Sequence, residues 1–290
     1  MNSVIAIDLG GTKTAMAVVD ETGYVHHKQK FPAARTLEGT IDQVAAYTSD
    51  AGKTQVGLIV PGIYHPRNGT AWAPNLWGHD YVPLRDALQD RLSLRTAIAS
   101  DRTGYVLGEQ WLGVARGLSD VIFVAVGTGI GVGILAGGHI VEGAHGIAGS
   151  AGWMAIESAW KPEYAETGCW ESEAAGPALA RRAGMLSAET VTAAARTGDQ
   201  HAVTAIAETA EYLAKGIANL ISVLDPELVV LGGGLMQAAD LLLEPVRAAV
   251  PRWAQPVAAK LARIERTRLG EDAGLLGAAR LALLHTCRQD

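Results

Sequence analysis

Three glycine-rich turns, each directly after an apolar run, constrain this chain more than any other feature. The runs VIAI, VIFVAV and ELVV lead into DLGGTK, VGTGIG and LGGG. Glycine adopts positive φ and lets backbone N–H groups approach a ligand, so such turns can surround phosphate oxygens without side-chain interference. One turn is weak evidence, because hairpins use glycine routinely. Three of them predict a phosphate-binding protein built on buried strands.

The first part of the chain alternates strands and helices. An antiparallel meander with the turn DETG opens it, and helical and strand patterns then follow one another. We expect strands at 4–7, 14–19, 25–29, 55–60 and 95–100, and helices at 37–51 and near 83–92. This order is typical of an α/β domain.

The pattern then restarts. VIFVAVGTG and GVGILAGGHIV echo VIAIDLGGTKTAMAVVDETGYV, which hints at a duplicated domain. The remainder is mostly helical, with predicted helices at 201–224 and 273–285 and a strand at 227–234. We place the boundary near 113–119. The prediction is a small domain, 1–115, a larger one, 116–272, and a final helix, 273–290, that packs back on the first.

Composition limits the partners. The 290 residues carry a net charge of −6 without a long basic run, which gives no electrostatic attraction for nucleic acid or anionic membrane. We see no signal peptide and no apolar run of about 18 residues, and expect a cytoplasmic protein. Cys169 and Cys287 cannot form a disulfide framework or a four-cysteine zinc site.

The glycine turns fit neither common nucleotide motif. Lys13 lies two residues after Gly11, so DLGGTK is not a Walker A loop, and no turn has the G-x-G-x-x-G pattern that opens a helix. A phosphate clamp between two related domains fits better.

The ordered set DLGGTK, SDRTGYVLGE, VGTGIGVGILAGG and LGGG resembles the ROK family. These are bacterial sugar kinases and related repressors of the actin, hexokinase and Hsp70-like superfamily. The resemblance spans residues 4 to about 282. It implies an α/β, two-domain actin-like ATPase (RNase H-like) fold, in which helices flank a mixed sheet in each domain and the active site lies in the interdomain cleft.

The resemblance also implies ATP and Mg²⁺ as cofactors. Asp8 would act on Mg²⁺ through water, although an aspartate at a strand end can also cap a turn. The residues expected around ATP are Asp8, Gly10, Gly11, Thr12, Lys13, Gly127, Thr128, Gly129, Gly232, Gly233 and Gly234.

Asp101 is the candidate general base, because transfer to a hydroxyl needs a group that takes its proton. It follows the strand RTAIAS and precedes a helical stretch. A helix N-cap is the alternative role, and Ser100 competes for it.

The acceptor pocket departs from the family. Where sugar kinases of the family carry Asn-Asp, this chain has Ser100-Asp101, and where they carry Glu-x-Gly-His it has SAGW, Ser150 to Trp153. Glu171 matches the family's sugar-binding glutamate. Trp153 could stack on a ring or could fill volume.

The family's zinc motif is also changed. The segment PEYAETGC retains only Cys169 of three cysteines, and one cysteine without its partners cannot hold tetrahedral zinc. We therefore predict no zinc.

Further acceptor-side candidates lie in PGIY and WAPNLWGHD. Gly62 and Asn75 match family positions, although Asn75 could be a turn residue after Pro74. Glu109 is expected to be structural, anchoring a backbone amide. The expected substrate-binding set is Gly62, Asn75, Ser100, Asp101, Ser150, Trp153 and Glu171.

These features predict an ATP-dependent kinase for a hydroxyl of a sugar or sugar-like polyol: a hexose, an amino or anhydro sugar, or a cyclitol. The alternative is a catalytically inactive sugar-binding sensor. A DNA-binding repressor is not expected, since the first strand begins at Val4. A homodimer is carried over from the family, and polyphosphate stays open as a donor.

Overall fold

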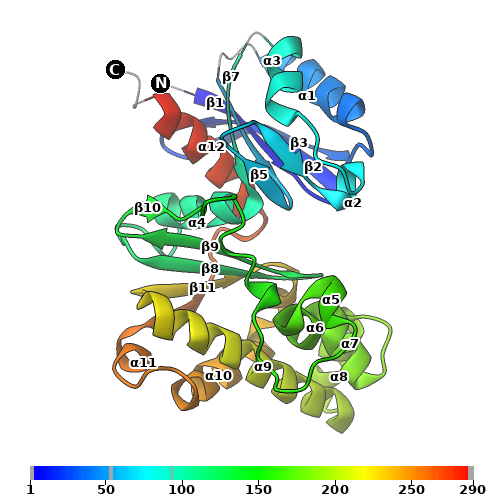
Figure 1. The fold of residues 1–290 in the computed structure, drawn as a ribbon, viewed down its shortest axis with the longest axis vertical. Coiled ribbons are helices and arrows are strands. Elements are labelled where there is room, and N and C mark those ends of the chain that lie inside the picture. The colour runs from blue at the N-terminus through cyan, green and yellow to red at the C-terminus, as the bar shows by residue number, and fades with distance from the viewer. Residues whose placement is uncertain (1–2, 52–54, 93, 287–290) are drawn as a thin grey trace. The chain divides into compact units, whose positions relative to one another are not determined.

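The structure, a computed structural model, describes residues 3–51, 55–92 and 94–286, and it divides into two compact units (Figure 1). Unit 1 comprises residues 1–117, 142–147 and 269–290, and unit 2 comprises residues 118–141 and 148–268. Cys287 and the last four residues of the predicted final helix lie outside the described residues.

Unit 1 is built on a five-stranded mixed sheet in the order β3-β2-β1-β4-β7. β1 pairs antiparallel with β2 and parallel with β4, and β4 pairs parallel with β7. The strands are β1 (Ser3–Leu9), β2 (Lys13–Asp20), β3 (Val25–Pro32), β4 (Gln55–Val60) and β7 (Arg95–Ser100). The carboxyl ends of β1, β4 and β7 therefore lie at one edge of the sheet.

Helices cover both faces of this sheet, which explains why β1 is a continuous apolar run. Ile5 and Ile7 pack in a core with residues of α1 and α3, whereas Val4 and Ala6 pack with residues of α12. The helices of unit 1 are α1 (Leu37–Ala51), α2 (Pro74–Trp77), α3 (Leu84–Arg91), α4 (Asp101–Leu112) and α12 (Ala273–Thr286), with the 3₁₀ helix η4 (Gly270–Asp272).

α12 brings the end of the described chain onto the first strands of unit 1. Its Leu275 and Ala278 are buried against Val4 and Ala6. It also crosses α4 closely, because a Cβ at Gly277 would collide with the backbone of Gly104. Unit 1 is thus closed by residues that are distant in sequence.

The sheet of unit 2 repeats the topology of the first. Its order is β10-β9-β8-β11-β12, with β9 antiparallel to β8 and β10, and β11 parallel to β8 and β12. The strands are β8 (Val121–Val126), β9 (Ile130–Ala136), β10 (His139–Ile140), β11 (Leu228–Gly232) and β12 (Arg263–Arg266). This match supports the duplication that the sequence echo suggested.

A helical layer packs on the sheet of unit 2. Ile122, Val124 and Val126 of β8 share one core with α6, α7, α9 and α10. The elements are α5 (Tyr164–Thr167), α6 (Cys169–Ala174), α7 (Gly176–Ala183), α8 (Ala188–Arg196), α9 (Gln200–Leu224), α10 (Ala239–Ala249), α11 (Ala258–Leu261), η1 (Ala151–Trp153), η2 (Gly234–Ala238) and η3 (Val250–Arg252).

Sequence patterns missed short elements. The hairpin of β5 (Ile63–His65) and β6 (Thr70–Trp72) and the edge strand β12 are too brief to show a clear period. Within the described ranges, no helix is both long and apolar enough to cross a membrane.

Candidate active site

Two carboxylates lie at the carboxyl-end edge of the unit 1 sheet. Asp8 is in β1, and Asp101 is the first residue of α4, directly after β7. Only β4 separates the two strands. Ligands of open α/β sheets bind at this edge, so both predicted residues stand where substrate chemistry occurs in such folds.

Both carboxylates bind protons unusually tightly. Burial, and then the negative charge of Asp101, raises the pKa of Asp8 to about 7. Burial also raises the pKa of Asp101 to about 6, although the Arg102 charge and hydrogen bonds from the backbone oppose the shift. Such raised pKa values in a pair of neighbouring acids are typical of functional sites.

The oxygen donors of this pair fit a hard divalent cation. A cation would offset the burial cost and the mutual repulsion that raise the pKa of Asp8. Asp8 also lies against the start of α12, because a Cβ at Gly274 would collide with its Oδ2. The residues present therefore fit the predicted Mg²⁺.

The two local interpretations of the Ser100-Asp101 pair are now distinguished. Ser100 is the N-cap of α4, and its side chain accepts a hydrogen bond from the Thr103 N–H. Asp101 lies in the first turn and its Oδ1 accepts the Arg102 N–H at 2.8 Å. Capping is therefore done by Ser100. The contact of Ser100 with the substrate stays a prediction.

The DLGGTK turn joins β1 to β2. The Gly10 N–H donates to the Lys13 carbonyl at 3.0 Å, while Thr12 and Lys13 are exposed. Arg35 holds this turn beside Asn75, since its Nη1 donates to the Gly11 carbonyl at 2.9 Å and to the Asn75 carbonyl at 2.7 Å. Sequence reasoning missed Arg35, which lies in no motif.

Arg102 and Tyr105 were also missed. Arg102 is buried, and its Nη2 donates to the Gly62 carbonyl at 3.1 Å. Burial raises the pKa of Tyr105 well above its ordinary value, and the charges of Asp8 and Asp101 raise it further. Tyr105 follows Asp101 by four residues on α4, so its helical spacing was an available signal, whereas Arg102 is the next residue along the chain and has no such spacing.

Glu109 has the structural role that the sequence predicted. It is fully buried, and its Oε2 accepts the Val114 N–H at 2.9 Å just beyond the end of α4.

The VGTGIG turn of unit 2 borders a cavity of about 560 Å³. Gly127, Thr128 and Gly234, all predicted to bind ATP, line it, together with residues of α7, α8, the segment between them and η2 that the sequence did not single out. Those residues are Gly176, Pro177, Ala180, Leu186, Ser187, Ala188, Glu189, Thr192, Arg196, Leu235, Gln237 and Ala238. The volume falls in the range of small-molecule sites.

The three glycines of LGGG differ in position. Only Gly234 is among the residues that line the cavity, whereas a Cβ at Gly232 would collide with the Phe123 ring. Gly233 has φ +87° and lies against the backbone of Val126.

Two cavity residues have distinctive environments. Leu186 is 98% exposed, so its side chain is open to contact with a ligand. Arg196 is held in place by Asp240 through contacts of 2.8 and 2.9 Å.

Trp153 is not buried. Its side chain is 57% exposed at the end of η1, and its backbone N–H donates to the Ser150 carbonyl at 3.2 Å. The interpretation as volume filler is therefore not supported, and the ring remains available to a ligand.

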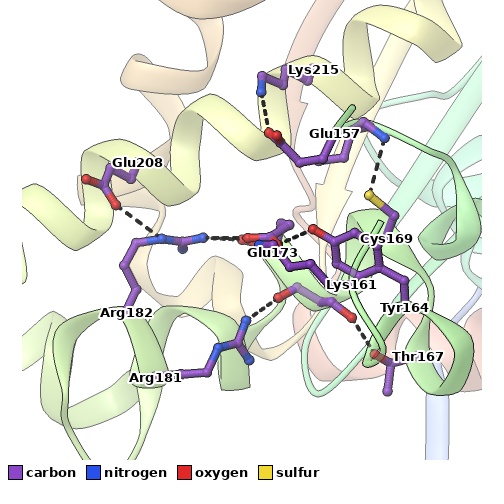
Figure 2. A network of polar contacts seen from close by, with 12 residues as sticks. Glu157, Lys161, Tyr164, Thr167, Cys169, Glu173, Arg181, Arg182, Glu208 and Lys215 are labelled. Atoms are coloured by element: carbon purple, nitrogen blue, oxygen red, sulfur yellow. Dashed lines mark hydrogen bonds and ion pairs between the residues drawn. The ribbon is translucent and has the colours of Figure 1, made fainter. Parts of the chain in front are cut away.

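A network of polar contacts lies around the segment PEYAETGC, which departs from the zinc motif implied by the family resemblance (Figure 2). Glu173, whose side chain is 5% exposed, accepts from Lys161 and Tyr164 at 2.5 Å and pairs with Arg182 at 3.4 Å. Cys169 is buried, and its Sγ accepts the Ile156 N–H.

Among the residues that the structure describes, no three His, Cys, Asp or Glu side chains gather as a metal site. That the protein holds no zinc stays a prediction.

Known proteins agree with this architecture. The family model of the ROK family matches residues 4–285. A glucokinase of Streptomyces coelicolor is 32% identical over 316 residues, covering 97% of this chain and 98% of that protein. An N-acetyl-D-glucosamine kinase of Pectobacterium atrosepticum is 31% identical over 300 residues, covering 96% and 98%.

A solved structure extends the match to the fold. A ROK family glucokinase from Streptomyces griseus, in complex with glucose and AMPPNP, superposes with a TM-score of 0.82 at 31% identity, covering 98% of this chain and 100% of that one. The predicted α/β fold with two mixed sheets is confirmed. The chain belongs to the ROK family.

Proposed function

We propose that the protein is an ATP-dependent kinase that phosphorylates a hydroxyl of a sugar or sugar-like polyol. The observation that carries this proposal is the Asp8–Asp101 pair at the carboxyl ends of β1 and β7, with both pKa values raised. The names of the relatives, glucokinase and N-acetyl-D-glucosamine kinase, support the same reaction class.

Asp101 is the proposed catalytic base. Its carboxylate takes the proton of the acceptor hydroxyl as the hydroxyl oxygen bonds to the γ-phosphorus of ATP. The bond between that phosphorus and the bridging oxygen breaks, and ADP leaves with the electron pair. A pKa of about 6 suits this task, because the group is ionised at neutral pH yet still basic.

Mg²⁺ would be held from the side of Asp8 and would neutralise charge on the phosphates. The chain's own residues would supply the rest of the donor site. The cavity of unit 2 is the proposed nucleoside site, and Gly10 to Lys13 and Gly127 to Gly129 are the proposed phosphate turns.

The acceptor side is proposed to include Gly62, Asn75, Ser150, Trp153 and Glu171. The exposed Trp153 offers an apolar face for the C–H side of a ring, and Ser150 replaces a charged acceptor by a hydroxyl. A site with fewer directional contacts discriminates less between hydroxyl patterns. We therefore favour an unusual hexose, an amino or anhydro sugar, or a cyclitol over glucose.

The test is ADP release with Mg²⁺ and ATP across hexoses, N-acetylamino sugars, anhydro sugars and cyclitols, with Asp101→Asn as the control. Acceptor-dependent turnover that collapses in the variant is expected. Binding of acceptors without turnover on any of them would contradict the proposal and favour the sensor alternative.

The same preparation tests two secondary expectations. Replacing ATP by polyphosphate compares the donors directly. The expected homodimer would have twice the 30.3 kDa chain mass by light scattering.

A further inference from the structure

Glu171 makes a contact that acceptor binding does not require. It lies on α6, and its Oε2 accepts the backbone N–H of Ile130 at 2.7 Å. Ile130 is the first residue of β9, directly after the VGTGIG turn. The acceptor-side carboxylate is therefore bonded to the end of a proposed phosphate turn.

Two glycines make this approach possible. A Cβ at Gly129 would lie 2.6 Å from Glu171 Oε2, and one at Gly152 would lie 3.0 Å from the same oxygen. Any larger residue at either position would press on the carboxylate. Part of the glycine content of residues 124–154 thus serves to seat Glu171.

The other end of the turn is held from the same helical segment. The Gly176 N–H, at the start of α7, donates to the Gly127 carbonyl at 2.8 Å. The Ala175 N–H donates to the Glu171 carbonyl at 3.0 Å, so the two anchors are joined by a short stretch of backbone. The turn is fixed at both ends by α6 and α7.

The VGTGIG turn forms part of the lining of the proposed nucleotide cavity. Gly127, Thr128 and Gly176 all line the 560 Å³ space. Without the hydrogen bond from the Ile130 N–H to Glu171, the turn would lose one of the two contacts that hold its ends. The buried Ile130 N–H would also lose its acceptor. Nucleotide binding would then weaken.

We propose that Glu171 is a positioning residue for the phosphate turn of the donor site, in addition to its acceptor role. The inference rests on the proposed function, since it needs a nucleotide in this cavity. It assigns the two oxygens different tasks. Oε2 holds the turn, while Oε1, which receives no hydrogen bond within the described structure, is left for a substrate hydroxyl.

The experiment measures binding of AMPPNP with Mg²⁺ by calorimetry in the absence of any acceptor, for the full chain and its variants. Glu171→Ala removes the anchor and should weaken AMPPNP about tenfold. Glu171→Gln keeps an oxygen that accepts the Ile130 N–H, so its AMPPNP affinity should stay within about twofold of the parent. The Gln variant should nevertheless raise the KM for the acceptor.

Val223→Ser is the control outside both proposed sites. Its side chain is exposed and does not line the cavity, so AMPPNP affinity should be unchanged. If Glu171 had only a structural role, its variants would change the melting temperature, but the AMPPNP affinities of Glu171→Ala and Glu171→Gln would not differ as predicted. Gly152→Ala, which crowds the carboxylate but keeps it, should weaken AMPPNP even if Glu171→Ala fails to fold.

The outcomes separate the two proposals. AMPPNP affinity that is unchanged in both Glu171→Ala and Gly152→Ala overturns the positioning role and leaves the kinase standing. An unaltered chain that binds no AMPPNP at all overturns the proposed function itself.

Discussion

Burial, and then the negative charge of Asp101, raises the pKa of Asp8, although the two residues belong to strand ends that β4 separates. One site therefore combines a carboxylate that is ionised above about pH 6 with one that keeps its proton to about pH 7. In phosphoryl transfer the ionised Asp101 carboxylate suits a general base. The protonation of Asp8 is expected to change when a cation binds beside it.

Asp101→Asn should lower kcat by about 10³-fold, because general-base assistance contributes on the order of 10²–10⁴. The measurement is steady-state turnover on the best acceptor. The variant should melt at or above the parent temperature at pH 8. The raised pKa means that the folded state loses stability as Asp101 ionises, and asparagine avoids that loss. A variant that is inactive because it has unfolded would not support the base assignment.

Activity should fall as the pH drops through about 6. Below this value Asp101 is protonated and cannot take the hydroxyl proton, so kcat/KM should decrease about tenfold per pH unit. The pH profile is measured at saturating Mg²⁺. The residual activity of Asp101→Asn should lack this limb, and an identical limb in that variant would assign the titration to another group.

The enzyme should need a higher Mg²⁺ concentration below pH 7. A protonated Asp8 does not attract a cation, so the Mg²⁺ concentration for half-maximal activity should rise as the pH falls from 8 to 6. In metal-free buffer at pH 8, Asp8→Asn should be more stable than the parent, because ionisation of Asp8 opposes folding. Equal Mg²⁺ requirements at both pH values would argue against Asp8 as the cation's partner.

Glu173→Ala should destabilise unit 2 by about 3 kcal/mol, since breaking a buried ion pair leaves charges without their partner. Burial alone would raise the pKa of Glu173, but hydrogen bonds from Lys161 and Tyr164, together with nearby positive charges, lower it. The stabilisation is present above the ordinary glutamate pKa and is lost as the pH falls below it. Urea unfolding measures the effect, with the exposed Glu166→Ala as the control. Equal midpoints for the two variants would contradict the prediction.

Leu186→Ser should raise the KM for ATP a few-fold and leave stability unchanged. The leucine is exposed in the free protein and lines the cavity proposed to hold the nucleoside, so a bound nucleotide is expected to bury it. Val223→Ser, which changes another exposed apolar residue outside the cavity lining, should leave the KM for ATP unchanged. Similar KM values in all three proteins would remove Leu186 from the nucleotide site.

The elements that sequence predicted best are those with a strong local signal. The helix Leu37–Ala51 and the strands Gln55–Val60 and Arg95–Ser100 have the predicted bounds. Their periodicity and the turn residues around them are local properties of the chain. β12 and the hairpin of β5 and β6 lack such signals, because four or three residues do not define a period.

The sequence by itself also determined the chemical inventory: glycine turns after apolar strands, two aspartates at strand ends, and an acceptor motif changed to Ser150 and Trp153. Only the tertiary structure decided which groups act together. The hydrogen bond from Ile130 to Glu171 spans 41 residues, and the hydrogen bond from Arg35 to Asn75 spans 40. Glu173 contacts Lys161 of a loop, Tyr164 of α5 and Arg182 of α7. Burial and neighbouring charge set the pKa values of Asp8 and Asp101, and both depend on contacts between distant segments that no local pattern records.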